Sequence, residues 1–143
     1  AMIGPDQHTA SGFDMPSQSR FGVVLMKAED AAAFDNPPRT AYIYFGQREG
    51  LKLGAGVCEV PVGSSNQRHA HDDADEVIYV LRGTVRFEFP GESLTLGPTE
   101  AVYIPAGLDH QIFNAGEVPA LHTFTFSPAG PEEAIRRKYR GRP

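Results

Sequence analysis

Three histidines and one glutamate are spaced as the ligands of a metal ion would be. His69 and His71 are separated by one residue, Glu76 follows five residues later, and His110 comes after a Pro-Ala-Gly segment further along the chain. Imidazole nitrogens and carboxylate oxygens bind divalent first-row transition metals, and a set that leaves coordination positions open lets such an ion do chemistry. These residues therefore predict a catalytically capable metal site.

Strand geometry explains how the four donors could meet. Side chains alternate between the two faces of a strand, so His69 and His71 point the same way. Glu76 lies at an odd offset from His71, which means that the chain must reverse before Glu76 can face the histidines. Residues 72–75, Asp-Asp-Ala-Asp, have the composition of such a turn. We expect His110 to join the set from a later strand.

The two segments resemble the motifs of the cupin superfamily. The first motif, G-X5-H-X-H-X4-E-X6-G, is matched in full by Gly63, His69, His71, Glu76 and Gly83. The second motif, G-X5-P-X-G-X2-H-X3-N, is matched by Pro105, Gly107, His110 and Asn114. Its leading glycine is missing, because Thr99 occupies that position and Gly97 lies two residues earlier. This departure leaves the donor set intact and affects only the turn before the strand.

The resemblance implies an all-β fold, a double-stranded β-helix (jelly-roll) barrel, with a metal near its open end. The implied ligands are His69, His71, Glu76 and His110, and the implied cofactor is one divalent transition metal per chain, either Fe, Mn, Ni, Zn or Cu. A cupin barrel that keeps these ligands without a catalytic metal is the structural alternative.

Length and composition fit one compact domain. The chain has 143 residues, and its 15 glycines and 12 prolines suit many tight turns between short strands. We expect an extended or poorly ordered segment over 1–20, the barrel over 21–130, and a short C-terminal helix with a basic tail over 131–143. Strands are predicted over 21–27, 40–45, 51–60, 67–71, 76–82, 84–89, 92–96, 101–104, 109–114 and 119–127, with a helical turn over 28–34.

Charge and cysteine usage limit the partners and the compartment. The net charge is −5, but five of the 13 basic residues lie in the last eight positions, so the body is strongly acidic and would repel nucleic acid. The chain has neither an apolar run long enough to span a membrane nor a signal-peptide pattern. The single cysteine, Cys58, excludes an internal disulfide and fits a reducing compartment, so we expect a cytoplasmic protein.

The cations near the end of the chain favour a solvated helix over a binding tail. Pro131 followed by two glutamates, with arginines later, is the charge order that suits a short helix and its dipole. The spacing also allows two i,i+4 ion pairs, Glu132 with Arg136 and Glu133 with Arg137.

Further candidates for the pocket are less distinctive. Arg86, Ile78 and Ile112 are candidate substrate-binding residues, although a solvated cross-strand ion pair is the favoured interpretation of Arg86. Tyr42, Tyr103 and His122 are candidate catalytic residues. A packed aromatic side chain is the favoured interpretation of the tyrosines, and a hydrogen-bonded core histidine is the favoured interpretation of His122.

Three functional classes follow from these observations. The first is a dioxygenase that acts on a small chelating organic acid or phenol, and the second is an isomerase, cyclase or lyase that uses the metal as a Lewis acid. The third is a cupin that binds a small ligand without turnover. The chain contains no arrangement typical of nucleophilic catalysis.

Apolar segments at 21–25 and 42–45 precede the motifs, and the resemblance implies that such strands pair two subunits, so we expect a homodimer.

Overall fold

The computed structural model describes residues 17–18, 20–138 and 140–141, and the chain divides into two compact units, residues 1–31 and 32–143. In the described part of the first unit, β1 (Ser17–Gln18) pairs antiparallel with β2 (Val24–Leu25), and a 3-10 helix, η1 (Ala28–Asp30), follows. The strand expected over 21–27 is therefore reduced to two residues. The segment expected to be extended or poorly ordered, 1–20, lies largely outside the described residues.

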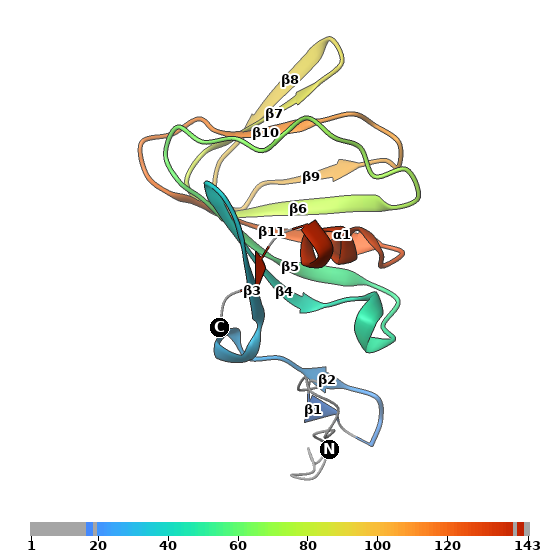
Figure 1. The fold of residues 1–143 in the computed structure, drawn as a ribbon. Coiled ribbons are helices and arrows are strands. Elements are labelled where there is room, and N and C mark those ends of the chain that lie inside the picture. Colours follow the sequence, from blue (N-terminus) through green and yellow to red (C-terminus); the bar gives the residue numbers. More distant parts are fainter. Residues whose placement is uncertain (1–16, 19, 139, 142–143) are drawn as a thin grey trace. The chain divides into compact units, whose positions relative to one another are not determined.

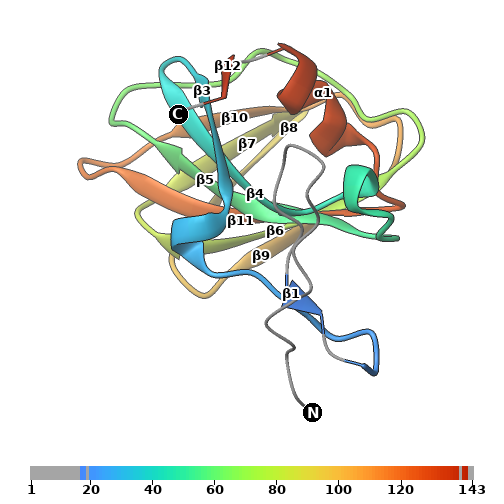
Figure 2. The same cartoon turned by 60° about the horizontal axis from the view of Figure 1, so that its bottom comes forward.

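The second unit consists of two antiparallel sheets (Figures 1 and 2). The larger sheet has the order β12-β3-β4-β5-β11-β6-β9, and the smaller sheet has the order β10-β7-β8. The strands of the larger sheet are β3 (Ala32–Asn36), β4 (Arg39–Phe45), β5 (Gly54–Val60), β6 (Asp75–Arg82), β9 (Ala101–Ile104), β11 (Ala120–Ser127) and β12 (Arg140–Gly141). Those of the smaller sheet are β7 (Val85–Phe89), β8 (Glu92–Leu96) and β10 (Gln111–Asn114). The predicted all-β jelly roll is confirmed.

Alternating burial along the strands explains why the sheets pack together. Along β5 and β11 the buried residues occupy every second position, as expected for strands with one face in a core. The buried cluster draws on both sheets and includes Cys58, Val60, Ile78, Val80, Val85, Phe87, Leu96, Ile104, Ile112, Phe124 and Phe126. Burying apolar surface stabilises the fold by roughly 25 cal/mol per Å², and here it fixes which side chains face inward.

Two segments differ from the sequence-based expectation. Residues 32–36 form β3 instead of continuing a helical turn, and Ala33 pairs with Tyr42 of β4. Alanine favours helices, but pairing with β4 satisfies the backbone hydrogen bonds, so the tertiary context prevails. Residues 67–71 are a loop instead of a strand, and one isolated bridge joins His69 to His110.

The C-terminal helix, α1 (Pro131–Lys138), is anchored to the barrel by a buried carboxylate. The expectation that Glu132 is solvated is wrong, because its side chain is fully buried. Its carboxylate accepts hydrogen bonds from the backbone N–H groups of Gln47 and Gly130, at 3.0 and 2.8 Å. A Cβ at Gly54 would overlap this carboxylate, so glycine is required there for the helix to dock.

The expected ion pairs along the helix are replaced by pairs to a turn. Arg136 binds Glu49 at the end of η2 (Gln47–Glu49), with an N–O distance of 2.7 Å, and Arg48 lies 3.3 Å from Glu133. Along the helix itself, Arg136 lies 3.5 Å from Glu133, at a spacing of i,i+3 instead of the expected i,i+4. Long-range partners are invisible to i,i+4 spacing, which explains the error. None of the helices in the described ranges is long and apolar enough to cross a membrane.

Backbone conformation explains the glycines of the two motifs. Gly63, Gly83 and Gly107 all have positive φ angles, between 74° and 85°, a region that side chains with a Cβ rarely adopt. Thr99, which replaces the leading glycine of the second motif, has φ of 73° and keeps the same left-handed conformation. The turn is therefore retained at the cost of local strain, since β-branched residues are genuine outliers in this region.

We predict that Thr99→Gly stabilises the protein. Removing the Cβ relieves about 1–2 kcal/mol of left-handed strain, and the added freedom of the unfolded chain offsets part of that gain. The expected net gain in the free energy of unfolding is therefore about 0.5–1 kcal/mol, measured by urea denaturation. Thr95→Gly, in exposed strand β8, is the matched control and should lose stability. A Thr99→Gly variant that is no more stable than wild type would show that the turn is unstrained.

Candidate metal centre

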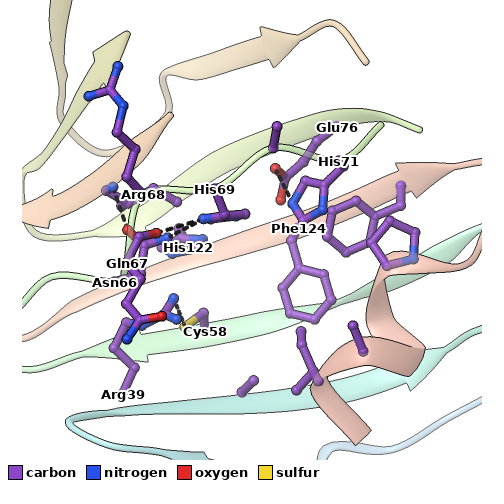
Figure 3. A pocket seen from close by; sticks show the side chains of 17 residues that line it. Arg39, Cys58, Asn66, Gln67, Arg68, His69, His71, Glu76, His122 and Phe124 are labelled. Carbon is purple, nitrogen blue, oxygen red and sulfur yellow. Dashed lines mark hydrogen bonds and ion pairs between the residues drawn. The ribbon is translucent and has the colours of Figure 1, made fainter. Parts of the chain in front are cut away.

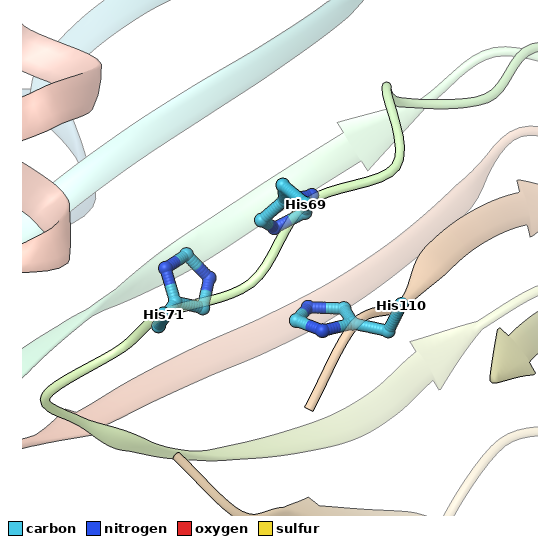
Figure 4. Close-up of side chains that lie close together, drawn as sticks. All are labelled: His69, His71 and His110. Atoms are coloured by element: carbon cyan, nitrogen blue, oxygen red, sulfur yellow. The ribbon is translucent and has the colours of Figure 1, made fainter. Parts of the chain in front are cut away.

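Three imidazoles converge at one side of the barrel (Figure 4). His69 and His71 come from the loop between β5 and β6, and His110 immediately precedes β10. One ring nitrogen of each lies within 4.8 Å of one ring nitrogen of the others. The ring centroids of His69 and His110 are 4.4 Å apart. This separation is short enough for a single ion to contact all three rings.

Backbone hydrogen bonds hold the two segments that carry the histidines together. The N–H of His69 donates to the carbonyl of His110 at 2.9 Å, and the N–H of His110 donates back at 2.8 Å. The N–H of Gly107 donates to the carbonyl of His71 at 2.9 Å. These reciprocal bonds fix the loop against the start of β10, so a strand over 67–71 is not needed to position the rings.

The tautomers of two imidazoles are set by nearby carbonyls. Nδ1 of His69 lies 2.8 Å from the carbonyl oxygen of Gln67, and Nδ1 of His110 lies 2.9 Å from that of Leu108. A carbonyl only accepts, so each Nδ1 must carry the hydrogen and Nε2 must carry the lone pair. Such outer hydrogen bonds are the usual means by which proteins orient histidine ligands of metals.

Glu76 completes the cluster from the first residues of β6. Its side chain is buried, and its Oε1 lies 3.6 Å from Nε2 of His71 and 3.4 Å from Nε2 of His110. Neither Glu76 Oε1 nor His110 Nε2 has a hydrogen-bond partner. Buried polar atoms without partners are costly, by about 1–3 kcal/mol each. A divalent cation would satisfy both atoms, so the residues present fit such an ion.

The surroundings tune the protonation of these groups. Burial lowers the pKa of His69, and burial together with the neighbouring histidines lowers that of His71 to about 4. Burial also acts against the charged form of His110, but the Glu76 carboxylate and the Leu108 carbonyl outweigh it and raise its pKa. Burial raises the pKa of Glu76. His69 and His71 are thus neutral at pH 7, as metal ligands must be.

A pocket of about 290 Å³ opens beside the cluster (Figure 3). It lies against the inner face of the larger sheet, and α1 forms part of its wall. The lining residues are Arg39, Ala41, Cys58, Asn66, Gln67, Arg68, His69, Ala70, His71, Glu76, Ile112, His122, Phe124, Phe126, Pro131, Ala134 and Ile135. A concave, mainly apolar pocket with a few converging polar groups is the usual form of a small-molecule site.

Comparison with known proteins agrees with this geometry. The cupin domain family model (Cupin_2) matches residues 56–126, the segment that contains every residue of the cluster. The chain belongs to the cupin superfamily.

Individual relatives extend the comparison. The chain is 34% identical over 80 residues to the tetracenomycin polyketide synthase protein TcmJ of Streptomyces glaucescens, covering 56% of this chain and 54% of that protein. It is 38% identical over 68 residues to germin-like protein 1 of Brassica napus, covering 44% of this chain and 33% of that protein. Among solved structures, KdgF from Halomonas sp. superposes with a TM-score of 0.65 at 23% identity, over 76% of this chain and 96% of that one, which shows a shared fold. The chain spans about half the length of the first curated relatives that it matches.

The pocket of this cupin contains only some of the further residues predicted from the sequence. Ile112 and His122 line it, whereas Ile78 is fully buried in the core and is not part of the wall. Arg86 is also absent from the lining. It lies 3.3 Å from Glu88, and its guanidinium stacks over the ring of Phe113. The ion-pair interpretation of Arg86 therefore fits the structure, although the pair lies within one strand.

The two candidate catalytic tyrosines lie outside the pocket. Tyr103 is 60% exposed and its hydroxyl donates to Asp75. Tyr42 is next to Ala41 in β4, and because Ala41 lines the pocket, alternation directs Tyr42 to the opposite face. Of the three catalytic candidates, the structure places only His122 in the pocket wall.

Polar pocket residues that the motifs do not indicate include Arg39, Cys58 and Asn66. Asn66 is structural in part, since its Oδ1 accepts a 2.7 Å hydrogen bond from the N–H of Ile112. Arg39 begins β4 and shares the inner face with Ala41 and Ile43, a period-2 pattern visible in the sequence. This alternation is the signal that would have placed Arg39 inside the barrel.

Proposed function

We propose that this chain is a metal-dependent cupin enzyme in which His69, His71, Glu76 and His110 hold one divalent transition metal. The observation that carries the proposal is the pair of buried, unpartnered atoms, Glu76 Oε1 and His110 Nε2, 3.4 Å apart beside two more imidazoles. Protein interiors rarely leave such atoms without partners unless a ligand satisfies them.

The donor set indicates the class of substrate. A divalent ion bound by three neutral imidazoles and one carboxylate keeps a net charge near +1 and supplies a Lewis-acid, redox-capable centre that attracts anionic bidentate groups. Phe124, Phe126 and Ile112 exclude bulk water beside it, which strengthens electrostatic attraction within the pocket. A small organic acid or phenol that chelates the ion fits both the charge and the cavity.

Oxygenation is the reaction that we propose for this site. An iron ion held by these four side chains would supply redox chemistry with dioxygen, and the apolar wall of the pocket suits a nonpolar gas. The role of the chain is to bind and orient the substrate, with Phe124 and Phe126 keeping competing water away from it.

Proton transfer, giving an isomerase, cyclase or lyase, is the second candidate. Two observations favour it: the similarity to TcmJ, whose name assigns it to a polyketide synthase, and the presence of His122 in the pocket wall. Burial lowers the pKa of His122 to about 4, so at neutral pH its imidazole is uncharged, and its unpartnered Nε2 is a weak base that can accept a hydrogen bond from the substrate. A ligand-binding cupin without turnover is the remaining alternative.

The first prediction concerns metal content. The double variant His69→Ala/His71→Ala should contain almost no metal, because it has lost two of the four donors. Wild type purified under the same conditions should contain about one ion per chain. His122→Leu is the matched control, since it removes an imidazole that lies outside the cluster, and it should keep its metal. Elemental analysis gives the comparison. Equal metal in wild type and the double variant would refute the assignment.

The second prediction concerns the reaction. The Fe(II)-loaded protein should convert members of a panel of small hydroxy acids and phenols only when dioxygen is present, with oxygen uptake that matches substrate loss. Turnover that continues unchanged under strict anaerobiosis, or that Zn supports equally well, would refute the dioxygenase proposal and favour an isomerase, cyclase or lyase that uses the metal as a Lewis acid. Stoichiometric binding without turnover under either condition would favour the non-catalytic alternative.

We also propose that the protein is a homodimer. Phe21, Val23 and Leu25 of the first unit are between 46% and 66% exposed, and exposed apolar groups of this kind suit a subunit contact. The segment 42–45 does not contribute an open edge, because β4 pairs with both β3 and β5. Light scattering at micromolar concentration should give twice the 15.5 kDa chain mass, and the mass of a single chain would contradict the proposal.

A further inference from the structure

The pocket has a second polar corner, formed by Arg39, Cys58 and His122 (Figure 3). These residues come from three neighbouring strands, β4, β5 and β11. Cys58 pairs with Ala41 on one side and with His122 on the other, so the three strands present them on one inner face. In Figure 3 Arg39 lies at the lower left and Glu76 toward the upper right, with the other labelled side chains mostly between them.

The positive charge of Arg39 faces a weak hydrogen-bond acceptor instead of a carboxylate. Its Nη1 donates to the sulfur of Cys58 at 3.7 Å, and burial raises the pKa of that thiol, so the acceptor is a neutral sulfur. A thiol is a poor acceptor, whereas a guanidinium offers five N–H donors in a planar fork. No carboxylate among the described residues lies within ion-pair distance of Arg39.

The other arginine of the pocket is different. Arg68 pairs with Asp109, at 2.5 Å. Outside the pocket, the carboxylates of Glu88, Glu49 and Glu133 pair with Arg86, Arg136 and Arg48. Arg39 is thus the cation of the described pocket wall that is left for a ligand.

The neighbours of Arg39 do not supply the missing anion. His122 is buried, its Nδ1 lies 2.8 Å from the carbonyl oxygen of Thr123, and its Nε2 has no partner. Burial, and then the positive charge of Arg39, lower the pKa of this imidazole to about 4, so it is neutral. Burial raises the pKa of Cys58 and Glu76, and the charge of Arg39 acts against that rise; at His69 it adds to the lowering of the pKa by burial, so its field extends across the pocket.

We propose that Arg39 is the specificity-determining residue of the pocket and binds a carboxylate of the substrate, while the chelating end of the same molecule faces His69, His71, Glu76 and His110. A carboxylate matches the guanidinium fork in two parallel hydrogen bonds. The inference rests on the proposed function and narrows it, because the substrate then carries an acid group in addition to its chelating oxygens.

Two chelating probes test the proposal by calorimetry on the Zn-loaded protein, in which no redox turnover occurs. Catechol offers only vicinal hydroxyls, whereas 3,4-dihydroxybenzoate adds a carboxylate at the far end of the ring; 3,4-dihydroxyphenylacetate extends the reach. In wild type at least one of the two acids should bind about tenfold or more tightly than catechol, the gain expected for a charge-assisted bidentate pair. Arg39→Gln should abolish that preference and leave catechol binding within about twofold.

The matched control is Arg68→Gln, which removes an arginine that lines the same pocket but has its own carboxylate partner, and it should keep the full preference. Arg39→Lys keeps the positive charge but loses the planar guanidinium, so it should retain part of the preference for the acids over catechol. It replaces Arg39→Gln in the test if thermal melting shows that Arg39→Gln does not fold. An equal preference in Arg39→Gln and wild type, or no preference in wild type while catechol binds, overturns the proposal.

Failure of the proposed function gives a different pattern. If the protein binds neither zinc nor catechol, the metal site is refuted, and Arg39 is then tested alone with benzoate on the metal-free chain. Benzoate binding to wild type and Arg68→Gln, but not to Arg39→Gln, would support the anion subsite. The absence of benzoate binding to wild type would overturn it.

Discussion

The site depends on a buried carboxylate and imidazole that face each other without a hydrogen bond. Glu76 Oε1 and His110 Nε2 are 3.4 Å apart, yet the barrel leaves both unpartnered. Two such atoms cost about 2–6 kcal/mol in all, a large fraction of the stability of a typical domain. The apolar core on both sides and the fixed backbone pairing hold the two groups at this ion-pair distance.

Rigid backbone contacts, more than side-chain packing, determine where the donors stand. The reciprocal hydrogen bonds between His69 and His110 join segments 41 residues apart, and carbonyls two residues before each histidine hold the rings in one tautomer. Left-handed turns at both ends of the first motif direct the chain into and out of this region. Asn114 contributes in the same way, because its amide bridges the carbonyls of Val60 and Val118 beyond the end of β10.

The resemblance of the two motifs to those of cupins predicted the fold, whereas the alternation argument for His69 and His71 was wrong, because these residues lie on a loop and not on a strand. Local patterns also failed where partners are distant in the sequence. The charge order around Glu132 suits a solvated helix, yet its carboxylate caps a turn 85 residues away. Arg86 and Arg39 look alike as arginines at strand positions, and only the alternation of Arg39 with the apolar residues Ala41 and Ile43 indicates that Arg39 faces inward. Alanines at 32–33 favour a helix until β4 supplies hydrogen-bond partners.

The pocket wall is assembled from two kinds of element. The metal donors lie on the barrel and its loops, where a change of backbone conformation disturbs strand pairing. Three other wall residues, Pro131, Ala134 and Ile135, lie on α1, which follows β11 and docks through side chains. Substitutions on the exposed turns of α1 can therefore reshape the cavity while the ion-binding groups keep their positions. Such a division lets substrate range diverge among related proteins without redesign of the reactive centre.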